Sequence, residues 1–365
     1  MSSDLVIAIV IASALAFGFT NGFHDTSDLV GTVVSTGAAP PQVAITLAAL
    51  LNFAGAFISV EVARTIATEI VDAGLITPAV VFAGLIGAIA WNLATWWQGL
   101  PSSSSHALIG GVVGATLAAA GTAGVDGSGL LDEFLIPALV APPLAFLAAA
   151  LLIVIAYRLF GTSRPGSVIR GFRRAQVVSG GLLALAHGAN DVQKTTGVIA
   201  LALIANGSLG SEADPPLWAS FAVAAALAVG TYSGGWRMLR TTGARIIKMD
   251  AAQAFSAQSA GAAVILTATF LGFPISTTHA INGGVMGGGA TKRVSAARWG
   301  IAGNIVTGWL LTLPAAAAIG AAAYGLMRIP GTGVVGPIVV AFVLLGLLVA
   351  VFMGRARRGS VGYAA

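Results

Sequence analysis

The stretch His187-Gly188-Ala189-Asn190-Asp191-Val192-Gln193-Lys194 is a polar octet set between two apolar runs that are long enough to lie inside a membrane. A second octet, Asn21-Gly22-Phe23-His24-Asp25-Thr26-Ser27-Asp28, interrupts the first apolar run of the chain. Each octet contains a glycine, an imidazole, an amide and an aspartate, with the positions of histidine and asparagine exchanged. This recurrence indicates an internal duplication.

A second pair of polar segments follows the octets in the same order. The segment Pro101-Ser102-Ser103-Ser104-Ser105-His106-Ala107 matches Pro274-Ile275-Ser276-Thr277-Thr278-His279-Ala280 in residue type at nearly every position. All four histidines of the chain lie in these four motifs. The chain therefore divides into two halves of similar design.

The composition excludes a soluble domain. Hydrophobic residues make up 57% of the chain and charged residues 8%, and the mean hydropathy is +0.92. Apolar runs of ~20 residues favour membrane-spanning helices. The chain has no cysteine, which excludes disulfides, thiol nucleophiles and thiolate metal sites. The start, Met1-Ser2-Ser3-Asp4, lacks a positive segment, so the first apolar run is expected to be a span and not a signal peptide.

The basic residues lie in short segments between apolar runs, so the net charge of +5 indicates membrane topology and not a nucleic-acid partner. If the basic segments are cytoplasmic, the run 5–36 crosses the membrane in the opposite direction to its counterpart 175–206. The sequence therefore predicts an all-α polytopic membrane protein with two inverted-topology repeats and about 10–12 transmembrane segments. Its parts are expected to be a first repeat (1–157), a basic cytoplasmic linker (158–174), a second repeat (175–324), and an extra C-terminal transmembrane helix with a basic cytoplasmic tail (325–365).

The octet-bearing runs are too long for simple spans. As continuous helix, each would measure roughly 48 Å against a hydrocarbon thickness of ~30 Å. We therefore expect the helices to break at Gly22 and Gly188, leaving backbone groups at membrane depth that line a cavity. The Pro-Ser/Thr segments are expected to start half-helices whose N-termini favour an anion. The short runs after them, 106–120 and 279–290, are either full spans or re-entrant hairpins.

Four charges are placed at membrane depth, where each is costly unless it is paired or hydrated. Asp25 and Asp191 recur at matching positions of the two octets, which favours a functional role over a structural ion pair. Asp28 and Lys194 also occupy matching positions, and a mutual salt bridge between them is one interpretation.

The remaining polar residues of the motifs are candidate ligands. His24 and His187 either relay protons or donate hydrogen bonds. The Ser/Thr runs either cap helices or contact an anion, and their recurrence in both halves favours anion contact. The candidate anion ligands are Ser103, Ser104, Ser105, Ser276, Thr277, Thr278, Asn21 and Asn190.

The four motifs resemble those of the inorganic phosphate transporter (PiT) family, in the form found in bacterial low-affinity phosphate permeases. The segment from His187 to Thr195 is similar to the second-half signature of the bacterial members, and Asn21 to Thr26 is similar to their first-half signature. The segments ending at Ala107 and Ala280 resemble the other repeated element of the family. The resemblance covers nearly the whole chain.

The resemblance implies symport of inorganic phosphate, either alone or as metal-phosphate, with a proton or sodium ion by alternating access. It implies that Asp25 and Asp191 bind the cation, as sodium ligands if the coupling ion is sodium, and that the Ser/Thr segments bind phosphate. We assign Asp28, His24 and His187 to cation coupling as well, because Asp28 and His24 depart from the pattern of sodium-coupled relatives. A homodimer in the cytoplasmic membrane is also implied, with no enzyme activity and no cofactor besides the co-transported ion.

The residues alone give the same mechanism. A doubly charged phosphate needs compensation in a low-dielectric cavity, and Lys194 is the one deep basic residue, so cations held by Asp25 and Asp191 would balance the charge. Three alternatives stay open: a sulfate permease of the same fold, a passive anion channel, and an intramembrane hydrolase. The hydrolase is disfavoured because no Gly-x-Ser-x-Gly or His-Glu-x-x-His motif is present.

Overall fold

The computed structural model describes residues 2–98, 102–241, 249–290, 299–329 and 335–340. Within these ranges the chain is helical, apart from connecting loops and one isolated bridge between Val71 and Val125. The predicted all-α fold is confirmed. The helices are α1 (Ser2–Ser35), α2 (Pro41–Gly55), α3 (Glu61–Thr68), α4 (Pro78–Gln98), α5 (Ser104–Ala120), α6 (Gly127–Gly129), α7 (Ile136–Phe160), α8 (Pro165–Ala205), α9 (Leu217–Thr241), α10 (Ala251–Phe270), α11 (Thr277–Ala290) and α12 (Trp299–Met327), with a 3₁₀ turn at Gly121–Gly124 and a π-helical turn at Leu130–Leu135.

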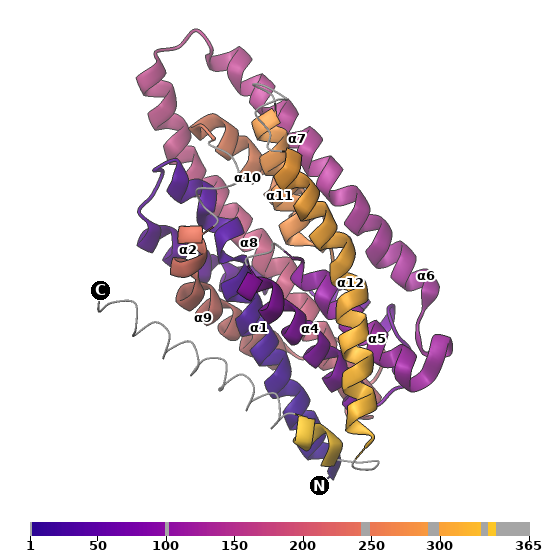
Figure 1. Ribbon diagram of the computed structural model, residues 1–365. Helices are drawn as coiled ribbons and strands as arrows, with labels where there is room; N and C mark the ends of the chain where they lie inside the picture. Colours follow the sequence, from indigo (N-terminus) through magenta and orange to yellow (C-terminus); the bar gives the residue numbers. More distant parts are fainter. Residues whose placement is uncertain (1, 99–101, 242–248, 291–298, 330–334, 341–365) are drawn as a thin grey trace, which may run out of the picture.

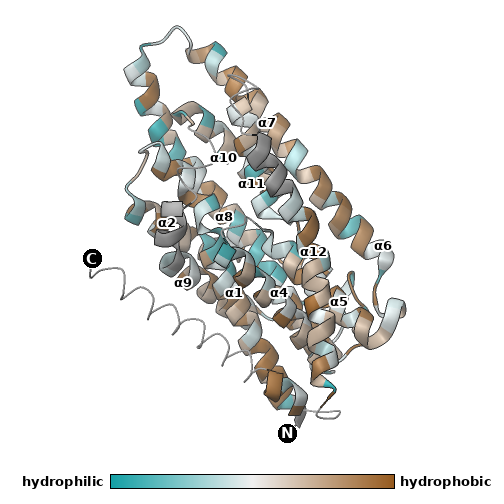
Figure 2. Ribbon diagram, in the orientation of Figure 1, coloured by the Kyte–Doolittle hydropathy of each residue, from teal (hydrophilic) through white to brown (hydrophobic). Residues whose placement is uncertain are grey.

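The helices form an elongated bundle with an apolar exterior (Figures 1 and 2). Among the described residues, five helical segments are long and apolar enough to cross a membrane. One of them runs through α7, whose outer side exposes leucines such as Leu139, Leu147 and Leu151. Large exposed apolar side chains are stable in contact with lipid and costly in contact with water. The architecture is that of a membrane protein.

The predicted helix breaks at the two octets are wrong. Both α1, with 34 residues, and α8, with 41 residues, run through their octets without interruption. At 1.5 Å per residue, α8 is roughly 60 Å long. Its excess length is polar, because the predicted linker from 165 onward forms the exposed first turns of α8 instead of a loop. The long helix therefore extends beyond the apolar layer and does not need to break inside it.

The octet glycines serve close helix packing. A Cβ atom on Gly188 would lie 2.0 Å from the carbonyl oxygen of Asn52 in α2, and one on Gly22 would lie 2.1 Å from the carbonyl oxygen of Leu227 in α9. Neither glycine has a positive φ. The absence of a side chain, and not unusual backbone freedom, is what these positions require.

The two Ser/Thr helices are each clamped between two other helices. A Cβ atom on Gly111 of α5 would lie 2.2 Å from an α4 carbonyl, and one on Gly114 would lie 2.1 Å from an α12 carbonyl. The equivalent glycines of α11, Gly284 and Gly287, meet carbonyls of α10 and α7 at 2.7 and 2.1 Å. Equivalent contacts thus occur in both halves, and each half supplies a clamping helix to the other.

Each Ser/Thr segment begins a helix that packs against the helix before it. With the helix before it, each forms one arm of a helical pair: α4 with α5, and α10 with α11. Figure 1 shows that α1 rises from the N-terminus at the foot of the view, whereas α8 descends from the loop at the top. This antiparallel course agrees with inverted repeats. Pro101 and most of the predicted C-terminal helix and tail lie outside the described residues.

Candidate functional site

The two octets meet in the middle of the bundle, where α1 and α8 lie against each other. Figure 2 shows polar residues gathered in this region, inside a largely apolar exterior. Asp25 and Asp191 are only 1% and 0% exposed. Because water does not reach either carboxylate, the surrounding side chains must satisfy their charges.

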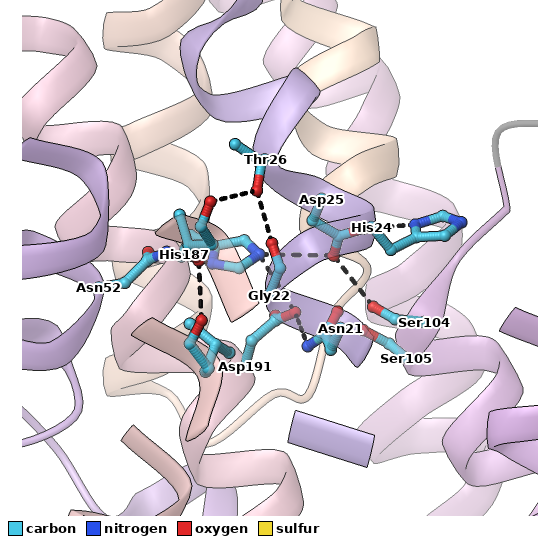
Figure 3. A network of polar contacts seen from close by, with 12 residues as sticks. Asn21, Gly22, His24, Asp25, Thr26, Asn52, Ser104, Ser105, His187 and Asp191 are labelled. Atoms are coloured by element: carbon cyan, nitrogen blue, oxygen red, sulfur yellow. Dashed lines mark hydrogen bonds and ion pairs between the residues drawn. The ribbon is translucent and has the colours of Figure 1, made fainter. Parts of the chain in front are cut away.

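Asp25 is surrounded by two imidazoles and a hydroxyl. Its Oδ1 lies 2.8 Å from Nδ1 of His24, and its Oδ2 accepts a hydrogen bond of 3.1 Å from the Ser104 hydroxyl (Figure 3). Nε2 of His187 lies 3.5 Å from the same Oδ2. Asp25 therefore joins α1 to the start of α5 and to α8.

Asp191 has a fixed positive charge beside it. Its Oδ1 lies 2.6 Å from the Lys194 ammonium, one helical turn further along α8. Its Oδ2 accepts 2.9 Å from the side-chain amide of Asn21 and lies 3.3 Å from Nε2 of His187. The predicted salt bridge between Asp28 and Lys194 is wrong: the ammonium pairs with Asp191, which is on its own helix face at i,i+3 spacing.

His187 stands between the two carboxylates, and its tautomer can be derived from its neighbours. The Asn52 amide nitrogen donates 3.1 Å to the Thr231 hydroxyl, which itself donates 2.9 Å to the Leu227 carbonyl. The Asn52 carbonyl oxygen therefore points at Nδ1 of His187, at 3.2 Å, and must accept a hydrogen there. Nε2 then faces Asp25 and Asp191, and a hydrogen bond to either requires one further proton.

This central cluster has the residue types of a cation site. Ligand atoms of Asp25, His187 and Asp191 all lie within 4.8 Å of one another. Two carboxylates and an imidazole suit a divalent transition metal, while oxygen ligands suit sodium. The geometry thus accommodates either a proton or a metal ion.

The hydroxyls of the Ser/Thr segments fall into three groups: helix caps, donors to other helices or segments, and hydroxyls without a partner among the described residues. Ser103 Oγ accepts 3.1 Å from the backbone N–H of His106, and Ser276 Oγ accepts 3.2 Å from that of His279, so both cap their helices. Thr277, which is buried, has a hydroxyl without a hydrogen-bond partner in the part of the chain that the structure describes. The first N–H groups of α5 and α11 have no partner within their own helix, as at every helix start.

The N-terminal ends of α5 and α11 touch each other. The Ser105 hydroxyl donates 3.2 Å to the Ile275 carbonyl, and the rings of His106 and His279 lie 4.6 Å apart between centroids. The predicted Ser/Thr segments of the two halves therefore converge beside the octets.

Comparison with known proteins identifies the family. The chain matches the phosphate transporter family twice, over residues 21–169 and 161–320. The chain belongs to this family. Together the two matches cover residues 21–320.

Curated relatives of the transporter are similar over most of its length. Proteins described as probable low-affinity inorganic phosphate transporters are 47% identical in Mycobacterium bovis (98% of this chain, 86% of the relative), 49% in Rhizobium meliloti (86% and 94%) and 44% in Bacillus subtilis (89% and 97%). A solved structure described as "The sodium-dependent phosphate transporter" is 24% identical, with a TM-score of 0.81, covering 89% of this chain and 99% of that one. The transporter shares its fold.

Family membership makes this chain a membrane-embedded phosphate transporter and not an enzyme. The family predicted from the four motifs is confirmed. The relatives named above are described as phosphate transporters, which disfavours the hydrolase and sulfate alternatives.

The structure also shows how the predicted amide ligands of the transporter are used. The side-chain nitrogen of Asn190 donates 2.9 Å to the Thr269 hydroxyl and 3.1 Å to the Phe273 carbonyl, which fixes the turn between α10 and α11. Neither of its amide hydrogens is left for an anion. The side-chain oxygens of Asn190 and Asn21 have no hydrogen-bond partner among the described residues, so these residues present acceptors, which suit a cation or a protonated ligand.

Asn52 and Thr231 were not among the residues predicted from the sequence. Both are buried in helices outside the four motifs, and together they determine the tautomer of His187. Asn52 could have been noticed as an amide within an apolar run, because a buried amide in a membrane helix usually needs a hydrogen-bond partner.

Proposed function

We propose that the chain is a secondary active symporter that imports inorganic phosphate together with protons by alternating access. The observation that carries the proposal is the position of His187. Its Nδ1 is committed to Asn52, and its Nε2 faces two buried carboxylates that it can bind only with an additional proton. That proton site is shared by both octets.

Charge balance explains why transport would be coupled. Phosphate carries up to two negative charges, and Asp25 and Asp191 add two more. Lys194 is the one lysine or arginine among the buried charged residues that the structure describes. Bringing phosphate beside these carboxylates in a low-dielectric interior is prohibitive without co-bound positive charge. Protons on the cluster supply that charge, so phosphate and protons bind together.

Phosphate would bind where the two Ser/Thr helices converge. The first N–H groups of α5 and α11 and the hydroxyls of Thr277 and Thr278 can donate to phosphate oxygens. The hydroxyls of Ser104 and Ser105 donate to Asp25 and to the Ile275 carbonyl in this structure, and they would turn to phosphate when it binds. Ser103 and Ser276 would hold the two turns as caps, and Asn190 would fix the second turn. Asn21 would orient Asp191. Asp28, which lies beside Thr278, would belong to the same polar region.

Alternating access follows from burial and from the repeated design. Phosphate and protons can reach Asp25 and Asp191 only if helices move, because both residues are closed off from solvent. Equivalent helix pairs in the two halves provide two related gates that open to opposite sides. If the gates move only when phosphate and protons are both bound or both absent, the proton gradient drives uptake.

Two other coupling modes have specific support. Sodium is favoured because the solved relative of the same fold is described as sodium-dependent, and because the side-chain oxygens of Asn21 and Asn190 are free. A divalent metal-phosphate as cargo is favoured by the grouping of Asp25, His187 and Asp191. If phosphate uptake requires sodium, the coupling ion is sodium and not the proton. If uptake requires a divalent metal at a fixed proton gradient, the cargo is metal-phosphate.

The test is phosphate uptake into proteoliposomes under separately imposed proton and sodium gradients. A proton gradient alone is expected to drive accumulation, and Asp25→Asn is expected to abolish it. Asp132→Asn provides a matched control, because Asp132 is exposed in the turn before α7. Normal accumulation by Asp25→Asn would contradict the role of the cluster.

Three further expectations remain predictions. The basic segments predict a cytoplasmic C-terminus and insertion in the cytoplasmic membrane, and the family resemblance predicts a homodimer. Accessibility labelling of an introduced C-terminal cysteine tests the first two, and the mass of the detergent-solubilised protein tests the third.

A further inference from the structure

The ammonium of Lys194 lies in a cage of three oxygen atoms. It pairs with Asp191 Oδ1 at 2.6 Å, donates 2.9 Å to the Ile275 carbonyl, and donates to the Ser105 hydroxyl. The side chain is only 2% exposed, so the charge is held inside the protein. The ammonium thus makes one ion pair and two hydrogen bonds, and all three of these contacts are to oxygen atoms.

The three oxygens come from three separate parts of the protein. Asp191 belongs to the octet of α8, Ser105 to the first turn of α5, and Ile275 to the segment that precedes α11. Proteins bind hard metal cations through oxygen ligands such as carboxylates and backbone carbonyls, and this site offers both together with a hydroxyl. The cage therefore has the chemistry of a cation site.

We propose that Lys194 is a tethered cation that occupies this oxygen-lined site in place of a mobile cation. The inference rests on the proposed symport, and it gives Lys194 a role of its own in the charge balance. The tethered charge cannot leave with the cargo. It lowers by one the number of mobile cations needed to balance phosphate.

The tether makes the two aspartates unequal. Asp191 forms an ion pair with Lys194, whereas among the described residues Asp25 contacts two imidazoles and a hydroxyl. Asp25 is then the carboxylate that responds to the coupling ion. Sequence position shows the same asymmetry, because Asp28 stands in the first octet where Lys194 stands in the second.

The tether also spans both halves. Through Ser105 and Ile275, one ammonium holds the starts of α5 and α11 together beside the octet. A cation in this cage is therefore needed for the arrangement that would receive phosphate. Removing the side chain but leaving the cage should create a protein that depends on an added small cation.

The experiment compares Lys194→Ala with Lys194→Met. The alanine variant leaves a hollow lined by oxygens, whereas the methionine variant fills most of that volume with an uncharged chain. Phosphate exchange is measured in proteoliposomes at equal pH and equal salt on both sides, so that ammonium does not act through a gradient. The salts are ammonium, methylammonium, sodium and choline chloride.

We expect Lys194→Ala to lose at least ~10-fold of wild-type exchange in choline, and to recover most of it in ammonium, methylammonium or sodium. The same cations should raise the melting temperature of this variant in detergent. Lys194→Met should not respond, because it has no empty cage. The rate of phosphate exchange by the wild-type protein should be the same in all four salts.

The idea is overturned if Lys194→Ala exchanges phosphate and melts identically in choline and in the small cations, or if it fails to fold even with them present. Lys194→Ser, which leaves a similar hollow, must give the same result as alanine. Failure of the proposed symport has a different signature: wild-type protein would then show no accumulation under a proton gradient, whatever the response of the Lys194 variants.

Discussion

Replacing Gly188 by alanine tests how α8 is held at the octet. The Cβ atom added by Gly188→Ala would lie 2.0 Å from the carbonyl oxygen of Asn52 and 2.6 Å from its carbonyl carbon. Ordinary contacts of a Cβ atom begin near 3.4 Å, so the two helices would have to separate by more than 1 Å. Both clashing atoms are backbone, and neither can rotate away.

Two opposing effects set the magnitude. Alanine in place of glycine within a helix gains about 1 kcal/mol from backbone entropy. Overpacking of this kind typically costs about 1–3 kcal/mol, and more when backbone must shift. We therefore expect a net loss, seen as a fall of roughly 2–6 °C in the apparent melting temperature. The shift would also pull Asn52 away from His187 and reduce phosphate uptake.

Gly171→Ala provides the control within the same helix. A Cβ atom there meets nothing within 4 Å, so only the gain in helix propensity applies. Both variants are compared with wild type by thermal unfolding in detergent and by phosphate uptake. If Gly188→Ala is as stable and active as Gly171→Ala, the close packing of α8 on α2 is not what this glycine provides.

Three further outcomes are expected. Asp191→Asn leaves the Lys194 ammonium buried without its carboxylate and should cost about 3–5 kcal/mol, and Asp191→Asn with Lys194→Met should recover most of that stability in a thermal melt. Ser104→Ala removes a donor that proposed phosphate binding uses, worth about 1 kcal/mol, so the half-saturating phosphate concentration should rise ~5-fold, and an unchanged value would count against it. Arg64→Gln breaks an exposed pair with Asp214 and should change stability by less than about 1 kcal/mol and leave uptake intact; a large loss of uptake would show that this pair matters for transport.

The duplication was the part of the fold most accessible to sequence reasoning. Four short motifs in the same order predicted two related halves, and the glycines that follow the Ser/Thr motifs make equivalent close contacts in α5 and α11. The motifs also indicated which charges would lie deep: Asp25 and Asp191 are both buried, and the ends of α5 and α11 converge beside them. Charged residues at membrane depth are few, so their recurrence was informative.

The glycines misled the prediction because one residue type serves two physical purposes. Gly22 and Gly188 were interpreted as points of backbone freedom, whereas both permit close approach of a neighbouring helix. A sequence does not state which helix packs against a given position, so the two purposes have the same appearance. The same lack of neighbour information hid Asn52 and led to the wrong partner for Lys194.

The hydroxyl runs were ambiguous for a related reason. Four consecutive serines begin the motif of α5, and only the phase of the helix decides that Ser103 is the cap and Ser104 faces Asp25. A shift of one residue turns a side chain by about 100° around the helix axis. Sequence therefore identified the segment, and the structure was needed to separate the roles of its members.

The most direct test of the account is phosphate accumulation by wild-type protein in proteoliposomes with a proton gradient, sodium-free buffers and no added divalent metal. We predict accumulation above equilibrium that collapses when a protonophore is added and is absent in Asp25→Asn. Accumulation that occurs only with an imposed sodium gradient, or mere equilibration of phosphate across the membrane, would contradict proton-coupled symport.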